Sequence, residues 1–379
     1  MNLVVDENIS FAEEAFSQFG EVKLLHGRQI TKDEINAADI LIVRSITKVN
    51  KDLLEGTPVK FAGTATIGTD HIDLEYLKKR NIFFKDAAGC NADAVAEYVF
   101  TVISHFAFEN AFSIEDKMIG IVGIGNIGSR IARLAENIGM PIIKNDPPLE
   151  RKLGKAGFSN LEKIFTADIV TFHVPLNLDG IDKTYHLINE EELLKLKDNA
   201  VLINASRGQV ITNDDLVKIR NRKKLFVNLD VWENEPDINP ILLNQINLAT
   251  PHIAGYSLEG KVNGTKIIYD SLCNYLNIEP TWSPVLPKIS DNEIKIDYDG
   301  NLTTALYKIF NKIYPIKEDD DKLRLAVKMN NKERAIYFDK LRKNYPLRRE
   351  FSNYKIKATN ADAKFVKVLN SFRFNVETI

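Results

Sequence analysis

The sequence predicts an α/β protein of two or three domains, built on parallel sheets that helices cover. Its 379 residues are more than a single domain with one hydrophobic core usually contains. Short apolar segments alternate with helical ones along most of the chain, which is typical of β-α-β units. Most of the later apolar segments are hydrophobic on both faces, as parallel strands buried between two layers of helices must be.

The first hundred residues hold the first alternating series. Its predicted strands are residues 3–6, 22–25, 40–45, 60–66 and 82–87, and its predicted helices are 10–19 and 74–80. A long helix is then expected over 91–106, because its apolar residues recur at spacings that line one face. This helix is the expected bridge into the next domain.

A second alternating series follows the long helix. It opens with strand 118–123 and helix 126–139, and its later predicted strands are 141–146, 168–175, 200–206, 225–231 and 246–253. Three prolines, Pro280, Pro284 and Pro287, then mark a linker. The remainder is richer in charge and mixes a predicted strand at 293–299 with helices near 303–313 and 331–343.

The composition is that of an ordinary globular protein. Lys and Arg number 50 against 52 Asp and Glu, so a net charge of −2 gives no sign of nucleic-acid or anionic-membrane binding. The N-terminus lacks the features of a secretory signal, and the most apolar window, 94–108, is too short to span a bilayer. Cys90 and Cys273 stand apart from any CxxC or Cys/His cluster. This favours a cytoplasmic location and argues against disulfides or a metal site.

The segment GIGNIG supplies a GxGxxG pattern between a predicted strand and a predicted helix. In dinucleotide-binding proteins the first glycine permits a tight turn, the second lets the backbone approach a pyrophosphate, and the third allows close helix–strand packing. The first N–H groups of the helix then face the phosphates. The candidate cofactor-binding residues in this segment are Gly123, Gly125, Asn126, Ile127 and Gly128.

Asp146 ends the next predicted strand, roughly 20 residues after the glycines, where dinucleotide-binding proteins carry the acid that binds a ribose 2′-hydroxyl. A carboxylate there would repel the extra phosphate of NADP, so NAD is the expected cofactor. Two other interpretations remain open. One is a plain strand-to-helix turn followed by a surface aspartate, and the other is an FAD site, although FAD motifs usually lie near the start of a chain.

Three later segments place candidate chemical groups at the ends of predicted strands, where open α/β sheets bind ligands. NASRG carries Arg207, whose planar guanidinium suits the carboxylate of a 2-hydroxy acid. DVWENEP carries Asp230 and Glu235, and TPHIAG carries His252. Taken alone, each segment has an ordinary alternative: a surface arginine, a solvated acidic loop and a structural histidine.

The chain has five other histidines, and position alone does not select His252 among the six. His105 lies on the long predicted helix, and His26 and His186 are expected to have no acidic or basic company at a strand end. His173 lies at a strand end before Pro175 and is a candidate for lining a cofactor cleft.

In their order and spacing, GIGNIG, Asp146, NASRG, DVWENEP and TPHIAG resemble the D-2-hydroxyacid dehydrogenases. The resemblance implies that Arg207 binds substrate and that Glu235 and His252 act as a pair. His252 is then the expected acid–base catalyst, which takes the proton of the C2 hydroxyl while the C2 hydride goes to NAD. A nearby carboxylate favours the imidazolium and fixes the orientation of the ring.

The resemblance also implies NAD contacts from Asp146, Asp230 and Gly255. This chain has Val174 where the family often has a threonine near the cofactor. A hydroxyl contact is therefore absent, although the backbone at Val174 can still line the cleft. Ser206 stands where the family often has cysteine, a conservative exchange that leaves the neighbouring arginine in place.

The architecture that the resemblance implies is an NAD-binding Rossmann domain inserted in a flavodoxin-like substrate (lid) domain, with a C-terminal α+β dimerisation domain. The expected boundaries are 1–112 and 257–285 for the lid domain, 113–256 for the Rossmann domain and 286–379 for the dimerisation domain. The resemblance implies a homodimer, because the dehydrogenases that carry this last domain dimerise through it, whereas most other members of the family end before it.

Four segments resemble one branch of this family, the dehydrogenases that oxidise 4-phospho-D-erythronate on the route to pyridoxal phosphate (vitamin B6). They are VRSITKVN, GTATIGTDHID, TPHIAGYSLEGK and YPLRREFSNY. In that branch the equivalents of Ser45, Thr66 and Tyr256 contact substrate, and hydroxyl groups suit its oxygens. Arg44 is either a phosphate contact or an ordinary surface charge.

Two alternative functions stay open. One is a different D-2-hydroxy acid as substrate, above all 3-phosphoglycerate. The other is a non-catalytic NAD-sensing module like the transcriptional corepressors that share this fold. The pattern YPLRREF argues against the second, because those corepressors tend to end in a disordered tail. No metal, nucleic acid or membrane is expected as a partner.

Overall fold

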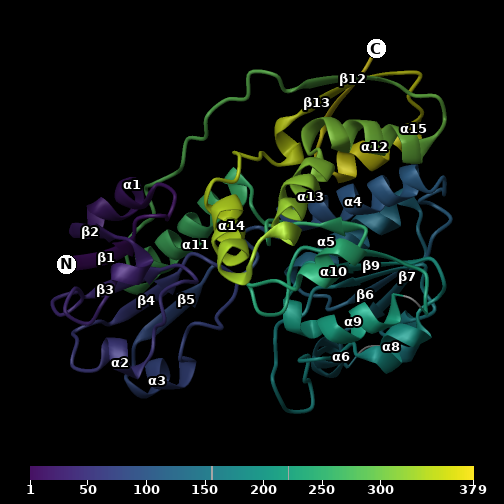
Figure 1. Ribbon diagram of the computed structural model, residues 1–379. Helices are drawn as coiled ribbons and strands as arrows, with labels where there is room; N and C mark the ends of the chain where they lie inside the picture. The colour runs from purple at the N-terminus through teal and green to yellow at the C-terminus, as the bar shows by residue number, and fades with distance from the viewer. Residues whose placement is uncertain (155–156, 221) are drawn as a thin grey trace. The chain divides into compact units, whose positions relative to one another are not determined.

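The computed structural model describes residues 1–154, 157–220 and 222–379, and the chain forms two compact units (Figure 1). The first unit comprises Met1–Asn91 and Ser257–Lys288, and the second comprises Ala92–Tyr256 and Ile289–Ile379. Each unit is therefore built from two separate stretches of chain. The three-domain division expected from the sequence has borders at 112 and 285 instead, and it stays a prediction.

The first unit contains a five-stranded parallel sheet with the strand order β2-β1-β3-β4-β5. The strands are β1 (Asn2–Asp6), β2 (Glu21–Leu25), β3 (Ile40–Val43), β4 (Phe61–Thr64) and β5 (Phe83–Asp86). This is the flavodoxin-like order, as the sequence predicted. The predicted helix 10–19 is divided, because α1 (Ala12–Phe16) passes into a 3₁₀ helix, Ser17–Phe19.

Helices cover both faces of this sheet because alternate strand residues point to opposite sides. Leu3 and Val5 of β1 pack in one core with the long helix α11 (Leu258–Leu276), whereas Val4 packs in a second core on the other face. That second core includes buried leucines of α2 (Lys51–Leu54) and α3 (Leu74–Lys79).

The second unit contains a six-stranded parallel sheet with the order β11-β10-β9-β8-β6-β7. The strands are β6 (Ile119–Val122), β7 (Ile142–Asn145), β8 (Ile169–Phe172), β9 (Ala200–Asn204), β10 (Leu225–Leu229) and β11 (Leu248–Ala249). The chain runs from β6 outward to β7 and then crosses back to β8 on the other side. This reversal is a topological switch point, and open α/β sheets bind ligands at its carboxyl edge.

Helices also cover both faces of the second sheet. They are α4 (Ala92–Glu109), α5 (Asn126–Ile138), α6 (Pro147–Leu153), α7 (Leu161–Ile164), α8 (Glu190–Lys195), α9 (Asn213–Ile219) and α10 (Pro240–Gln245). Ile169 of β8 faces the core that contains α4 and α5, whereas its neighbour Val170 faces the core that contains α7 to α10. Each large aliphatic side chain buried in these cores stabilises the fold by about 1.5–3 kcal/mol.

The C-terminal stretch of the second unit adds a three-stranded parallel sheet with the order β12-β13-β14. Its elements are β12 (Glu293–Asp297), α12 (Leu302–Ile313), α13 (Ile316–Arg324), α14 (Asn331–Lys343), β13 (Lys355–Thr359), α15 (Ala363–Ser371) and β14 (Asn375–Thr378). The strand and the two helices predicted here correspond to β12, α12 and α14.

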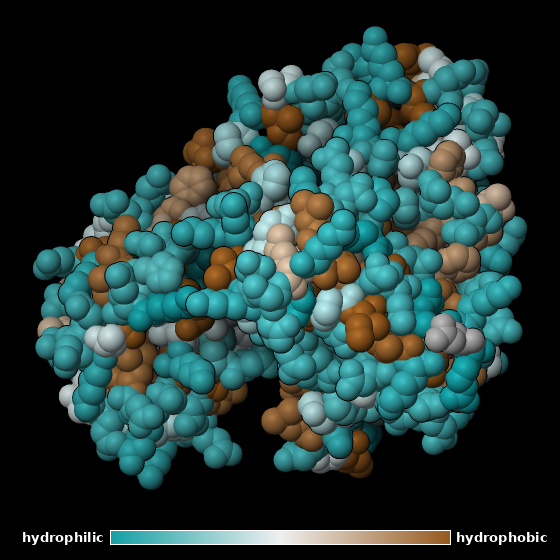
Figure 2. Space-filling model, viewed as in Figure 1, coloured by the Kyte–Doolittle hydropathy of each residue, from teal (hydrophilic) through white to brown (hydrophobic). Residues whose placement is uncertain are grey.

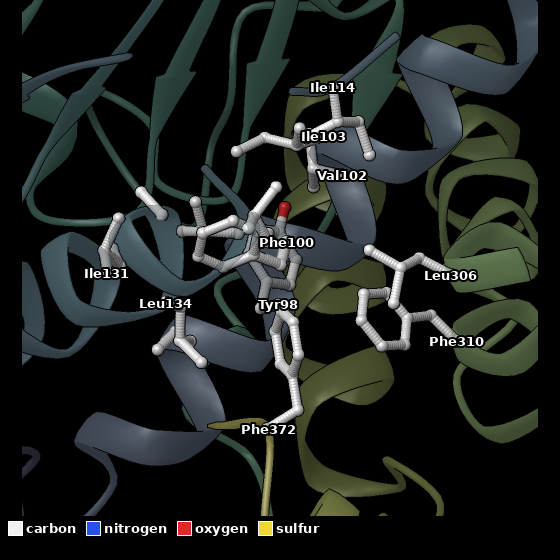
Figure 3. Packing of buried hydrophobic residues seen from close by; sticks show 14 of the residues in the cluster. Tyr98, Phe100, Val102, Ile103, Ile114, Ile131, Leu134, Leu306, Phe310 and Phe372 are labelled. Atoms are coloured by element: carbon white, nitrogen blue, oxygen red, sulfur yellow. The ribbon is translucent and has the colours of Figure 1, made fainter. Parts of the chain in front are cut away.

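This C-terminal stretch shares a hydrophobic core with the larger sheet of its unit. Figure 3 shows side chains of α4, α5 and α12 meeting around Phe100. The Phe372 ring lies edge-on to both Phe100 and Phe310, with centroids 5.2 Å and 4.9 Å away. The helix α4 packs against the larger sheet and also against α12 in this one core. The C-terminal stretch is therefore anchored to the helix layer of the larger sheet.

The surface view in Figure 2 is mostly hydrophilic, with hydrophobic residues in small groups. No helix in the described ranges combines the length and the apolar character that crossing a bilayer requires. The same residues contain no group of three or more His, Cys, Asp and Glu side chains placed to hold a metal ion.

Candidate active site

The glycine-rich turn joins β6 to α5, as the sequence predicted. Gly123 has a φ of +88°, and a Cβ there would lie 2.4 Å from the His173 carbonyl oxygen. A Cβ on Gly128 would lie 1.9 Å from the Gly123 carbonyl oxygen. Gly125 is exposed at the N-terminus of α5, and a Cβ there would meet no described atom within 4 Å. The first and third glycines thus allow the close packing, and the second leaves open space beside the helix N-terminus.

Asp146 stabilises this turn from the end of β7. One carboxylate oxygen accepts a hydrogen bond from the Ile124 N–H at 2.7 Å, and the other caps α6 by accepting from the Leu149 N–H at 2.9 Å. Asn126 is exposed and Ile127 is half-buried in the first turn of α5. The expected contact between Asp146 and a ribose hydroxyl stays a prediction.

His173 and Val174 follow β8 and lie against the glycine-rich turn. A Cβ on Gly123 would lie 2.9 Å from a Val174 methyl carbon. The His173 Nε2 lies 2.8 Å from the Thr171 hydroxyl, whereas its Nδ1 is buried without a hydrogen-bond partner among the described residues. Burial lowers the pKa of His173 to about 3, so its ring is neutral near pH 7.

The structure pairs His252 with Glu235, the two residues that the resemblance to the family implies act together. The His252 Nδ1 lies 2.7 Å from one Glu235 carboxylate oxygen, and the other oxygen accepts from the Trp232 N–H at 2.8 Å. Burial raises the pKa of Glu235, but the charge of His252 and its hydrogen bond outweigh burial, so the pKa lies below its usual value. The His252 Nε2 makes no hydrogen bond to any described residue, and 34% of the side chain is exposed. This nitrogen is therefore available to a substrate.

Asp230 holds the turn that carries His252. Its carboxylate is 1% exposed and accepts hydrogen bonds from the Thr250 hydroxyl at 2.7 Å, the Ile253 N–H at 2.7 Å and the Ala254 N–H at 3.0 Å. The Asp230 carbonyl oxygen also accepts from the His252 N–H at 2.7 Å. This anchoring was not expected from the sequence. The predicted contact between Asp230 and NAD is not tested by it.

Arg207 follows β9 at the same edge of the sheet. Its guanidinium donates to the Ser206 carbonyl oxygen at 2.8 Å, and its own carbonyl accepts from the Asn204 side chain at 2.9 Å. A Cβ on Gly208 would lie 2.0 Å from the Trp232 carbonyl, so the two segments touch. Because β9, β10 and β11 are neighbours in parallel register, the segments with Arg207, Glu235 and His252 leave one edge of the sheet.

One expectation about the other histidines is wrong. His186 has acidic company, because its Nε2 lies 2.5 Å from the Glu233 carboxylate. The second oxygen of Glu233 accepts from the Asn213 N–H at 2.8 Å. The two glutamates of DVWENEP therefore go to different histidines. Neighbours in the sequence do not reveal such pairing, since His186 and Glu233 lie on separate loops.

The four other predicted site residues fall in both units. Ser45 follows β3 and is exposed, and Thr66 follows β4, with its hydroxyl 2.8 Å from the Thr64 hydroxyl. Both lie at the carboxyl edge of the first sheet, where β3 and β4 are paired. In the second unit, Gly255 and Tyr256 are half-buried and lie three and four residues after His252.

Arg348, in the C-terminal stretch, is a further residue at this turn that sequence reasoning missed. It is buried, and its guanidinium donates to the carbonyl oxygens of Ala254 at 2.5 Å and Tyr256 at 3.3 Å. Its cationic carbon lies 4.5 Å from the centre of the Tyr314 ring. Arg348 belongs to the segment YPLRREF, which in the sequence is a mark of family resemblance. The segment alone does not reveal that Arg348 reaches the turn of His252.

Two family models match the chain. One, described as D-isomer specific 2-hydroxyacid dehydrogenase, NAD binding domain, matches residues 102–254. The other, described as a domain of unknown function, matches residues 285–371. The second match covers most of the C-terminal stretch that carries α12 to α15.

Solved structures share the fold. The NAD-bound 3-phosphoglycerate dehydrogenase of Entamoeba histolytica is 25% identical, with a TM-score of 0.62 over 76% of this chain and 99% of that one. The D-lactate dehydrogenase of Aquifex aeolicus, complexed with NAD and lactic acid, is 24% identical, with a TM-score of 0.59 over 73% of this chain and 96% of that one.

Curated relatives match almost end to end. The erythronate-4-phosphate dehydrogenase of Proteus mirabilis is 44% identical over 99% of both chains, and that of Photorhabdus laumondii is 42% identical over 100% of both. This chain therefore belongs to the erythronate-4-phosphate dehydrogenases of the D-isomer specific 2-hydroxyacid dehydrogenase family.

Proposed function

We propose that this protein is an NAD-dependent dehydrogenase that oxidises 4-phospho-D-erythronate to 2-oxo-3-hydroxy-4-phosphobutanoate in the biosynthesis of pyridoxal 5′-phosphate. The near full-length similarity to erythronate-4-phosphate dehydrogenases supports the substrate. The observation that carries the chemistry is the hydrogen-bonded His252–Glu235 pair, at the ligand-binding edge of a parallel sheet.

The second unit fits a bound dinucleotide. The open space at Gly125 lies at the N-terminus of a 13-residue helix, where unpaired N–H groups attract phosphate. Asp146 places negative charge beside this turn and so disfavours the additional phosphate of NADP. The proposed cofactor contacts are Gly123, Gly125, Asn126, Ile127, Gly128, Asp146, Val174, Asp230 and Gly255.

Bound NAD supplies the acceptor for the hydride that leaves C2 of the substrate. The Nε2 of His252 takes the proton of the C2 hydroxyl, so one hydride and one proton leave and a ketone forms. The Glu235 carboxylate accepts a hydrogen bond from the Nδ1–H of His252, which selects the ring tautomer with an unprotonated Nε2 and stabilises the imidazolium. In the reverse direction the imidazolium returns the proton.

Arg207 is the proposed partner of the substrate carboxylate, because a guanidinium can donate two parallel hydrogen bonds to it. Hydroxyls of Ser45, Thr66 and Tyr256 are the proposed contacts to the remaining oxygens. Arg44 follows β3 next to Ser45 and is a proposed phosphate contact. These roles extend the resemblance to the family onto the residues of this chain.

We also propose that the protein works in the cytoplasm as a homodimer that forms through its C-terminal stretch. The cysteines support the location, since Cys90 and Cys273 are buried and belong to no CxxC or Cys/His cluster. The match of residues 285–371 to a separate family model supports a dedicated role for this stretch. The three-domain division belongs to the same proposal.

The test is NADH formation with 4-phospho-D-erythronate and, in parallel, with 3-phosphoglycerate. The proposal expects turnover of the four-carbon acid with a clearly higher kcat/KM. Preference for 3-phosphoglycerate would move the assignment to another dehydrogenase of the family. Binding of NAD without turnover of any 2-hydroxy acid would favour a cofactor-sensing role instead.

A further inference from the structure

Arg342 brings a cation from the C-terminal stretch to Tyr256, four residues after His252. It lies in the last turn of α14, and its guanidinium carbon is 5.7 Å from the centre of the Tyr256 ring. It also lies 6.0 Å from the ring of Phe338, one turn earlier on the same helix. The Nε of Arg342 is buried and has no hydrogen-bond partner among the described residues.

The titratable groups whose charge acts on this guanidinium are Tyr256, Glu235 and, on its own helix, Asp339. Burial lowers the pKa of Arg342, but Tyr256 and the Glu235 carboxylate outweigh burial and raise it. In return, Arg342 is one of the charges that lower the pKa of Glu235. The cation and the carboxylate therefore stabilise each other, although the hydrogen bond of Glu235 goes to His252.

Tyr256 is held from two sides by the C-terminal stretch. Arg342 lies by its ring, and the Tyr345 ring meets it edge-on, with centroids 6.0 Å apart and planes at 78°. The Tyr345 hydroxyl is fixed in turn, because it donates to the Asp319 carboxylate at 2.8 Å. A cation beside an aromatic ring and an edge-on ring pair both restrict the orientation of Tyr256.

We infer that Arg342 is a positioning residue of the active site, which orients Tyr256 and whose charge stabilises the carboxylate of Glu235, the hydrogen-bond partner of His252. This inference rests on the proposed function and deepens it. It gives the C-terminal stretch a part in turnover that is separate from assembly of a dimer. A planar guanidinium is suited to this place, since it stacks on a ring while its charge reaches a carboxylate.

The experiment compares Arg342→Ala, Arg342→Lys and the matched control Lys343→Ala in the full chain. Lys343 is the next residue on α14 and is exposed. We expect kcat to fall by about 10- to 100-fold in Arg342→Ala, because small displacements of catalytic groups cost this much. The KM for NAD stays unchanged. Lysine restores only part of kcat, and guanidinium chloride below denaturing concentrations restores part of it to Arg342→Ala. Lys343→Ala keeps the wild-type kcat.

Two results would overturn the inference. One is a wild-type kcat in Arg342→Ala, and the other is a raised KM for the hydroxy acid with kcat unchanged, which indicates uniform substrate binding rather than positioning. If Arg342→Ala does not fold, the kcat of Arg342→Lys decides, and a wild-type value rejects the inference. Failure of the proposed function would be seen separately, because the wild-type protein would then not oxidise 4-phospho-D-erythronate. In that case the Arg342 variants are compared with wild type on whichever 2-hydroxy acid the wild-type protein oxidises.

Discussion

Two histidine–glutamate pairs of the second unit draw their glutamates from one segment, DVWENEP, yet their surroundings differ. The side chains of His252 and His186 are similarly exposed, at 34% and 32%, and each lies within hydrogen-bond distance of its glutamate. Exposure and distance therefore do not distinguish them. What distinguishes them is the set of contacts that holds each histidine and its backbone turn in place.

The His186–Glu233 pair joins two loops. Its carboxylate also accepts from the Asn213 N–H at the start of α9, and the His186 ring stacks on Tyr185 with centroids 3.9 Å apart. The His252–Glu235 pair involves instead a turn that Asp230, directly after β10, and Arg348, in the C-terminal stretch, both anchor. The contrast teaches that a nearby carboxylate does not by itself mark the proposed catalytic histidine, and that the anchoring of the turn that carries the ring is what differs between the two pairs.

The largest difference between the pairs is expected from replacing their glutamates. Glu235→Gln should lower kcat on the order of 10²-fold, because an amide does not stabilise the imidazolium as a carboxylate does. Glu233→Gln should leave kcat within a few-fold, since its partner is not at the proposed reacting atoms. Steady-state NADH formation measures both. Equal losses in the two variants would remove the distinction between the pairs.

Asp230→Asn should reduce stability by about 1–3 kcal/mol, because the amide leaves a buried N–H of the catalytic turn without an acceptor. Thermal unfolding measures the loss, at roughly 2–4 °C for each kcal/mol in a domain of this size. Asp214→Asn is the control, since Asp214 is exposed in the first turn of α9. An unchanged melting temperature in Asp230→Asn would contradict the anchoring role.

The smallest effect concerns pH. The pKa of Glu235 is lowered in the folded protein, so its stabilising contribution is present above the unfolded value of 4.5 and is lost as the pH falls through the folded pKa. The difference in unfolding free energy between wild type and Glu235→Gln should therefore shrink from about pH 6 to about pH 3. Chemical denaturation across this range measures it. A difference that stays constant would show that the charge of Glu235 does not contribute.

The sequence predicted those parts of the fold that depend on local patterns. Alternating apolar segments gave the strands of both larger sheets, and GIGNIG gave the turn at β6, because its spacing has a direct steric meaning. The predicted helix 10–19 was too long, since the chain tightens into a 3₁₀ turn after Phe16. Residue patterns alone did not select His252 as the catalytic candidate among the six histidines, and the resemblance to a family made that choice.

The supports of the site were not predictable from local patterns. Arg348 and Arg342 lie about 90 residues beyond the turn that they hold, and only tertiary packing brings them to Tyr256. The same is true of His186 and Glu233, which no sequence spacing connects. Buried polar groups find their partners through the whole fold, so a sequence shows the groups but not the pairing.

The central claim, that His252 is the acid–base catalyst, is tested most directly by His252→Ala and His186→Ala side by side. NADH formation from 4-phospho-D-erythronate and NAD affinity are measured for both. His252→Ala should bind NAD as wild type does and lose turnover on the order of 10²–10⁴-fold, whereas His186→Ala should remain within a few-fold of wild type. Full turnover in His252→Ala would contradict the account.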